Sequence, residues 1–125
     1  MRAFAELLDR LVLTPQRNGK LRLLVDYFRT TPDPDRGLAL AAITRDLELQ
    51  SVKPAMLRAL IAERTDPTLF AYSYDYVGDL AETISLIWPG PSETAPGANL
   101  PLGIVVHELQ HASRREGPML VAGWL

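Results

Sequence analysis

Cysteine is absent from this chain of 125 residues. Disulfide bonds, thiolate metal sites and a cysteine nucleophile are therefore excluded, and the absence is typical of a cytoplasmic protein. Long apolar runs are missing too, because none approaches the roughly 18–20 residues that a membrane span requires. The first ten residues, MRAFAELLDR, interrupt their apolar pattern with acids and do not form the apolar stretch of a signal peptide. We therefore expect a cytoplasmic protein with no membrane partner.

Lysine is scarce. Eleven of the thirteen cationic residues are arginine, and only Lys20 and Lys53 are lysine, so a mechanism that needs a covalent lysine has two candidates. The net charge of −2 counts against nucleic-acid binding by bulk charge, because domains dedicated to that role are usually basic. With 47% hydrophobic and 22% charged residues, the composition predicts a packed core rather than disorder.

The alternating pattern of a β-sheet is also missing, and apolar residues recur instead at the helical spacing i, i+3, i+4, i+7. The sequence therefore predicts an all-α fold. We expect further helices over residues 35–46, from Pro54 onward, from the Asp66-Pro67 start to Val77, and from Leu80. The three clearest apolar faces are Phe4, Leu7, Leu8 and Leu11; Leu21, Leu24, Val25 and Phe28; and Leu102, Val105, Val106 and Leu109.

Helix ends are marked by short signals. Thr14, which precedes a proline, is a helix-start signal, and Asp66 before its own proline predicts a second capped start. Gly78 predicts a helix stop in the left-handed conformation. Asp79 and Glu82 form a D-x-x-E start signal for the helix that follows.

Residues 89–101 form the clearest linker. The segment WPGPSETAPGANLP, residues 88–101, holds four prolines and two glycines and has almost no apolar pattern. We expect it to separate a first helical half, residues 1–88, from the start of a second half, residues 102–125. When the sequence is shifted by 98 residues, the start of the first half aligns with the second half. Each of these segments is predicted to form an apolar helix, a basic turn and a second apolar helix. The echo is either a true repeat or the chance similarity of two helical hairpins.

The segment HELQH, residues 107–111, matches the zinc-hydrolase pattern H-E-x-x-H. In that chemistry His107 and His111 would share a metal from one helical face, and Glu108 would act as general base. On a helical wheel the two histidines fall about 150–170° from the apolar face of the same helix. The chain has no third histidine. We therefore interpret HELQH as a solvated helix face and keep a zinc-dependent hydrolase as the alternative.

Other catalytic patterns are absent, including the phosphate-binding G-x-x-x-x-G-K-[ST], G-x-G-x-x-G and the nucleophile elbow G-x-S-x-G. Asp33 and Asp35 lie in a turn and are expected to serve as cap and solvent groups. Tyr72, Tyr74 and Tyr76 are interpreted as helix packing, with base stacking as the alternative.

Three blocks of the chain resemble the N-terminal part of bacterial ATP-dependent DNA ligases found beside a helicase and a nuclease in DNA-repair gene groups. They are FAELLDRLVLTPQRNGKLRLLVDYFRTTPDPDRGLALAAI, YDYVGDLAETISLIWP and HASRREGPMLVAGWL. The resemblance covers nearly the whole chain apart from the linker. It implies a helical DNA-binding domain of two similar halves that holds nicked duplex DNA across the minor groove, in the cytoplasm with the nucleoid. In this family the turn between the first two helices of each half contacts phosphates, and the matching residues are Thr14, Gln16, Arg17, Asn18, Lys20, Ser113, Arg114 and Arg115.

The chain departs from the family in its chemistry. These ligases are adenylated on the lysine of a K-x-D-G motif, and neither Lys20 nor Lys53 is followed by x-Asp-Gly. We therefore expect no catalytic residue here, with ATP, Mg²⁺ and strand joining in DNA repair, replication and recombination belonging to the catalytic domains of a parent ligase. A helical protein-interaction module is the remaining alternative.

The chain stops within an apolar stretch, which predicts a domain that is incomplete at its C-terminal end. Apolar side chains exposed there would promote self-association. The residues concerned are Met119, Leu120, Val121, Trp124 and Leu125.

Overall fold

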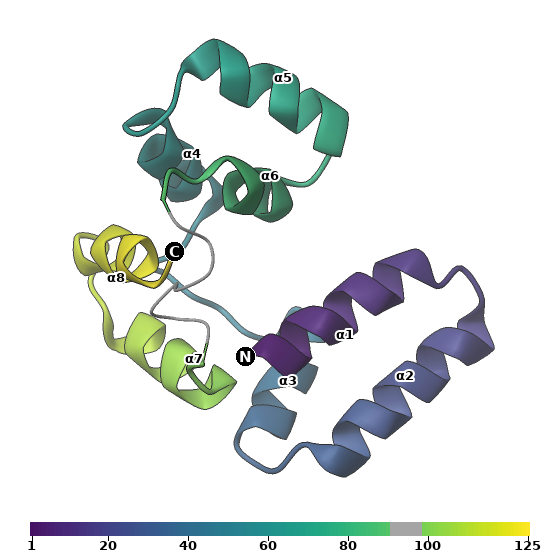
Figure 1. Ribbon diagram of the computed structural model, residues 1–125. Helices are drawn as coiled ribbons and strands as arrows, with labels where there is room; N and C mark the ends of the chain where they lie inside the picture. The colour runs from purple at the N-terminus through teal and green to yellow at the C-terminus, as the bar shows by residue number, and fades with distance from the viewer. Residues whose placement is uncertain (91–98) are drawn as a thin grey trace. The chain divides into compact units, whose positions relative to one another are not determined.

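The computed structural model describes residues 1–90 and 99–125, and in these two ranges it contains eight helices and no strand (Figure 1). The predicted all-α fold is confirmed. No helix in this part of the chain is both long and apolar enough to cross a membrane. Most of the predicted linker, residues 91–98, lies outside the described residues. The helices are α1 (Arg2–Leu13), α2 (Arg17–Thr30), α3 (Asp35–Ile43), α4 (Pro54–Ala62), α5 (Pro67–Val77), α6 (Leu80–Ile87), α7 (Leu102–His111) and α8 (Glu116–Trp124).

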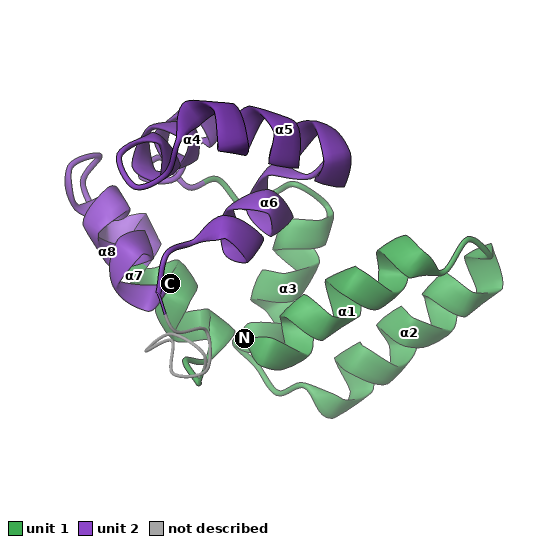
Figure 2. Cartoon of the chain, turned by 45° about the horizontal axis from the view of Figure 1, so that its top comes forward, with its two compact units in different colours: residues 1–48, 98–108 green, residues 49–97, 109–125 purple. Residues whose placement is uncertain are grey.

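The chain forms two compact units (Figure 2). Unit 1 comprises residues 1–48 and 98–108, and unit 2 comprises residues 49–97 and 109–125. Each unit therefore takes residues from both sides of the 89–101 segment. The division into ligase-type halves, residues 1–88 and 102–125, stays a prediction.

The core of unit 1 brings α1, α2, α3 and α7 together. Phe4 and Leu7 of α1 are buried, and the Phe4 ring centroid lies 6.1 Å from that of Tyr27 on α2. Leu102 and Val106 of α7 complete the same buried cluster with Ala39 of α3. Helices as short as these are marginal in water by themselves, so this shared apolar contact is what stabilises them. Burial also raises the pKa of the Tyr27 hydroxyl.

The buried face of α2 differs from the one predicted. Leu21 and Val25, expected to face the core, are 47% and 43% exposed, whereas Tyr27 is only 9% exposed. The buried side is turned toward Leu23, Leu24, Tyr27 and Phe28. The spacing rule failed because a tyrosine ring, whose hydroxyl takes a polar contact, contributes more apolar area than a valine.

Two long-range hydrogen bonds hold the start of α7 within unit 1. The Gly103 amide donates to Asp35 Oδ1 at 2.8 Å, and the Met1 ammonium group donates to the Leu100 carbonyl at 3.0 Å. Asp35 was expected to be a solvent or cap group within its own turn. It instead accepts from a backbone amide 68 residues further along the chain.

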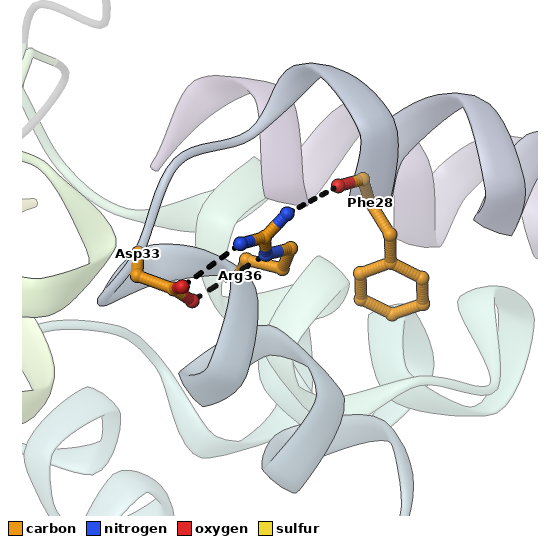
Figure 3. A network of polar contacts seen from close by, with 3 residues as sticks. All are labelled: Phe28, Asp33 and Arg36. Carbon is orange, nitrogen blue, oxygen red and sulfur yellow. Dashed lines mark hydrogen bonds and ion pairs between the residues drawn. The ribbon is translucent and has the colours of Figure 1, made fainter.

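Arg36 satisfies the C-terminal end of α2 (Figure 3). Its guanidinium group donates to the Phe28 carbonyl at 3.4 Å and forms an ion pair with Asp33 at 2.8 Å. The last four carbonyls of a helix have no partner within the helix, and arginine is well suited to reach them. The hydrogen bond from Arg36 lowers the pKa of the exposed Asp33 carboxyl.

Unit 2 confirms the predicted helix-end signals. The Asp66 carboxylate accepts from the Thr68 amide at 3.1 Å, with Pro67 as the first residue of α5. Gly78 ends α5 at φ +81°, the left-handed conformation that glycine adopts without steric cost. The Asp79 carboxylate accepts from the Glu82 amide at 2.9 Å and caps α6.

Ser51 is in close contact with α8, and this contact positions α8 within unit 2. Ser51 is buried and donates its hydroxyl hydrogen to the Leu109 carbonyl at 2.6 Å. Gly117 packs so closely on Ser51 that a Cβ atom added there would overlap the Ser51 carbonyl oxygen. The helix pair α4 and α8 is in contact, with Leu60 and Ile61 of α4 buried. A side chain at position 117 would therefore force α8 away from the Ser51 segment.

We expect Gly117→Ala to lower the free energy of unfolding by about 1–3 kcal/mol, because the clash is with backbone that has no rotamer to change. Gly123→Ala is the matched control in the same helix, since a Cβ there meets no described atom within 4 Å. Its free energy of unfolding should be unchanged or raised by up to about 1 kcal/mol. Urea denaturation of the two variants checks this, and equal stability would contradict the close contact.

Candidate nucleic-acid interface

The turn between α1 and α2 is closed by Thr14. Its hydroxyl donates to the Arg10 carbonyl at 2.7 Å, and its amide donates to the Leu11 carbonyl. Helix α2 then begins at Arg17 after Gln16, and no described side chain caps it. The predicted start signal at Thr14 is therefore wrong, because this threonine completes the last turn of α1 rather than capping α2.

The first turn of α2 lies tightly against Thr14. A Cβ atom at Gly19 would come within 2.7 Å of the Thr14 methyl carbon, so glycine permits this approach. The side chains of Gln16, Arg17, Asn18 and Lys20 are all exposed around it. The structure thus brings together the five residues that the resemblance assigns to the first phosphate-contacting turn.

The electrostatics of this helix start favour an anion. The first turn of α2 contains two cations, Arg17 and Lys20, and no acid. The first amides of any helix lack intrahelical partners and carry the positive end of the helix dipole. With Gln16 in an extended conformation and no side-chain cap in the described chain, these amides remain available to a phosphate oxygen.

The second predicted turn, between α7 and α8, contains a capping box. The Glu116 amide donates to Ser113 Oγ and the Ser113 amide donates to Glu116 Oε1, both at 3.2 Å. This reciprocal pair satisfies two amides at the start of α8. The S-R-R-E spacing of residues 113–116 is its sequence signal, and it was missed. Ser113 therefore has a structural role, while Arg114 and Arg115 are exposed.

Arg114 shares a surface hollow with a residue that the sequence did not single out. The hollow, of about 290 Å³, is lined by Gln50, Ser51, Lys53, Met56 and Arg114, all of unit 2. Lys53 directly precedes α4. Two cations beside one hollow form a second basic position. Lys53 and Arg114 are 61 residues apart, so only the fold reveals their proximity.

The cations are segregated along the chain, and the net charge hides this. Residues 65–113 contain no lysine or arginine and six acids. Eleven cations fall within residues 1–64, where they outnumber eight acids, and the other two are Arg114 and Arg115. A net charge of −2 is therefore compatible with local basic surfaces at the two turns.

The predicted orientation of the HELQH helix is confirmed. Leu102, Val105, Val106 and Leu109 are all buried, at 3–7% exposure, while His107, Glu108 and His111 are exposed. Among residues 1–90 and 99–125, no three or more His, Asp or Glu side chains are grouped closely enough to hold a metal ion. The zinc-dependent hydrolase stays an untested alternative.

The tyrosines of α5 divide between two environments. Tyr74 stacks on Phe70 with ring centroids 5.9 Å apart, and the Arg58 guanidinium lies 5.8 Å from the Tyr74 centroid. Tyr72 and Tyr76 are 73% and 93% exposed. The packing interpretation is therefore wrong for these two tyrosines and holds for Tyr74.

The apolar C-terminal helix is only partly covered. Met119 is 73% and Leu125 is 37% exposed. Leu120, Val121 and Trp124 are half-buried instead of exposed. Self-association through these residues stays a prediction, on a smaller surface than the sequence implied.

Comparison with known proteins adds no identification: no family model, no curated protein and no solved structure matches the chain. A functional assignment therefore depends on the surface chemistry of the two turns and on the sequence resemblance.

The capping box predicts a pH dependence confined to α8. Hydrogen bonds from the side chain and the backbone amide of Ser113 lower the pKa of the Glu116 carboxyl. A lowered folded-state pKa means that the stabilisation is complete above the ordinary glutamate pKa and is lost as the pH falls through the folded-state value. NMR amide signals of residues 113–117 should shift over that acidic range. Glu116→Gln keeps an acceptor but does not titrate, so its signals should stay constant, and identical profiles would contradict the capping role.

Proposed function

We propose that this chain binds duplex DNA without sequence preference, as the N-terminal DNA-binding part of a bacterial ATP-dependent DNA ligase acting in DNA repair. The observation that carries the proposal is the start of α2, where exposed Arg17 and Lys20 flank an uncapped run of backbone amides. Amides and flexible cations together are a combination that proteins use for phosphate oxygens.

Binding of this kind gains free energy from counterion release. Each phosphate neutralised by a cation frees condensed counterions, so affinity falls steeply with salt. Phosphate contacts of this kind position a protein on the duplex and carry no sequence information. In unit 2, Lys53 and Arg114 beside the hollow would supply a second contact with the DNA phosphates.

The chemistry of strand joining is not assigned to this chain. Neither lysine lies in a K-x-D-G motif, so the residues present do not fit an adenylation site. In the proposed parent ligase, ATP-dependent adenylation with Mg²⁺ and the joining of 5′-phosphate to 3′-hydroxyl occur in the catalytic domains. The role proposed for this chain is to hold the nicked duplex for them.

The first test is fluorescence anisotropy of a labelled nicked duplex at low and moderate salt. We expect the Arg17→Ala/Lys20→Ala variant to bind roughly tenfold more weakly. The negative slope of log K against log salt should become shallower by about 2, because two phosphate contacts are lost.

The matched control is Arg2→Ala/Arg29→Ala. It removes the same charge from two exposed positions at the end of the α1–α2 hairpin opposite the turn (Figure 1). Its affinity should stay close to that of the unaltered chain. Equal weakening in both variants would show that only overall charge matters, and absence of binding at low salt would contradict DNA binding by this chain.

The second basic position has its own test. Lys53→Gln/Arg114→Gln should also reduce the salt slope by about 2 and the affinity for the nicked duplex severalfold. The two basic positions belong to different units and share no residue, so we expect the variant that combines all four substitutions to reduce log K by the sum of the two effects. A salt slope unchanged by Lys53→Gln/Arg114→Gln would remove the hollow from the interface.

A further inference from the structure

Helix α5 presents an apolar aromatic stripe that its own unit leaves uncovered. Leu69 is 52%, Tyr72 is 73% and Tyr76 is 93% exposed, and no residue of α5 is buried. At about 100° per residue these three positions fall within about 60° of one another. Both tyrosine rings are therefore in contact with water unless another molecule covers them. We refer to Leu69, Tyr72 and Tyr76 as the α5 stripe.

The opposite side of α5 is already occupied. Phe70, Tyr74 and Val77 are half-buried, with Phe70 and Tyr74 stacked and Arg58 over the Tyr74 ring. Helices α5 and α6 are in contact. The α5 stripe is therefore not a misplaced core face, because α5 has a separate face that packs within unit 2.

The charged residues of α5, of α6 and of the segments that flank them all have one sign. Residues 66–88 carry four acids, Asp66, Asp75, Asp79 and Glu82, and no lysine, arginine or histidine. The two ion pairs that arginine forms in the described residues, Arg36–Asp33 and Arg64–Glu63, involve none of these four acids. Asp75 is exposed and, on the helical wheel, lies about 60° from Tyr72.

The neighbouring cations of unit 2 are turned to aromatic rings elsewhere. Arg58 lies over Tyr74, and Arg64 lies 5.0 Å from the Trp88 ring centroid while pairing with Glu63. A surface of exposed tyrosine, leucine and aspartate repels a nucleic-acid backbone. It is complementary to a segment that combines arginine or lysine with apolar side chains, since guanidinium groups stack on tyrosine and pair with carboxylates.

From this complementarity we infer that the α5 stripe docks a basic amphipathic segment of a partner protein. Its apolar residues cover Leu69 and the tyrosine rings, and its cations lie over Tyr72 and Tyr76 and beside Asp75. Tyrosine is among the residues that dominate protein interfaces. A stripe of three side chains is small, so the complex belongs to the weak, transient class with micromolar affinity. This role is separate from the proposed DNA contact and does not depend on it.

The test uses the full chain and a fluorescein-labelled 18-residue peptide with leucine and arginine at helical spacing. A peptide of the same composition with its leucines dispersed around the helix is the probe control. We expect micromolar binding of the amphipathic peptide, weakened at least tenfold by Tyr72→Ser/Tyr76→Ser and about threefold by Asp75→Asn. Val12→Ser/Leu13→Ser, which removes two apolar side chains that are 85% and 80% exposed in unit 1, should leave the affinity unchanged.

Four outcomes would overturn the inference. The amphipathic peptide fails to bind, or it binds the Tyr72→Ser/Tyr76→Ser variant as tightly as the unaltered chain. Alternatively, a single-stranded oligonucleotide binds and is lost with the same tyrosines, which would assign the stripe to base stacking. Sedimentation equilibrium covers the remaining case, because a dimer abolished by Tyr72→Ser/Tyr76→Ser would make a second copy of the chain the occupant.

Discussion

Packing of the Tyr27 ring against Phe4 is the contact on which the candidate DNA interface depends. Helices α1 and α2 have 12 and 14 residues, and helices of these lengths are only marginally stable in isolation. The aromatic contact between them therefore stabilises both helices. The turn between them then has a fixed geometry, with Thr14 closing α1 and Gly19 allowing α2 to begin directly against it. Arg17 and Lys20 project from a helix start that is held in place, so the proposed phosphate contact would lose less entropy than a contact from a mobile turn.

Unit 2 is organised by a different constraint, the approach of α8 to the backbone of Ser51. That approach fixes the start of α8, where Ser113 and Glu116 cap each other, and it places Arg114 beside Lys53. The basic hollow and the α5 stripe are thus products of the same unit with opposite chemistry. One surface suits an anion, and the other suits a cationic partner. An acidic chain can combine both because its cations are confined to two stretches of sequence.

Much of the fold could be read from the sequence wherever a signal is local. The caps at Asp66 and Asp79, the left-handed Gly78 and the burial of the apolar face of α7 all follow from residues within one or two turns of each other. Two local signals were misread, since Thr14 ends α1 and the Ser113–Glu116 capping box was missed. The other errors occur where distant residues decide. The rotation of α2 toward Tyr27 is set by packing on Phe4, and the bond between Asp35 and Gly103 joins residues with no pattern in common.

The candidate site was predictable to a similar extent. The residues of the α1–α2 turn are adjacent in sequence, so the resemblance could name them together. Lys53 could not be found this way, because its neighbour Arg114 lies in another part of the chain. The exposure of Tyr72 and Tyr76 was missed because tyrosine at helical spacing usually packs inward, and only the placement of α6 and Arg58 shows which face of α5 is covered.

The most direct measurement is an NMR titration of the ¹⁵N-labelled chain with a short duplex at low salt. We predict that the largest amide shifts occur at residues 16–20, with a second group at residues 53–56 and 114–115, and that the amides of residues 69–76 stay unshifted. Shifts centred on α5, or no shifts at any residue, would contradict a phosphate-binding role for the start of α2.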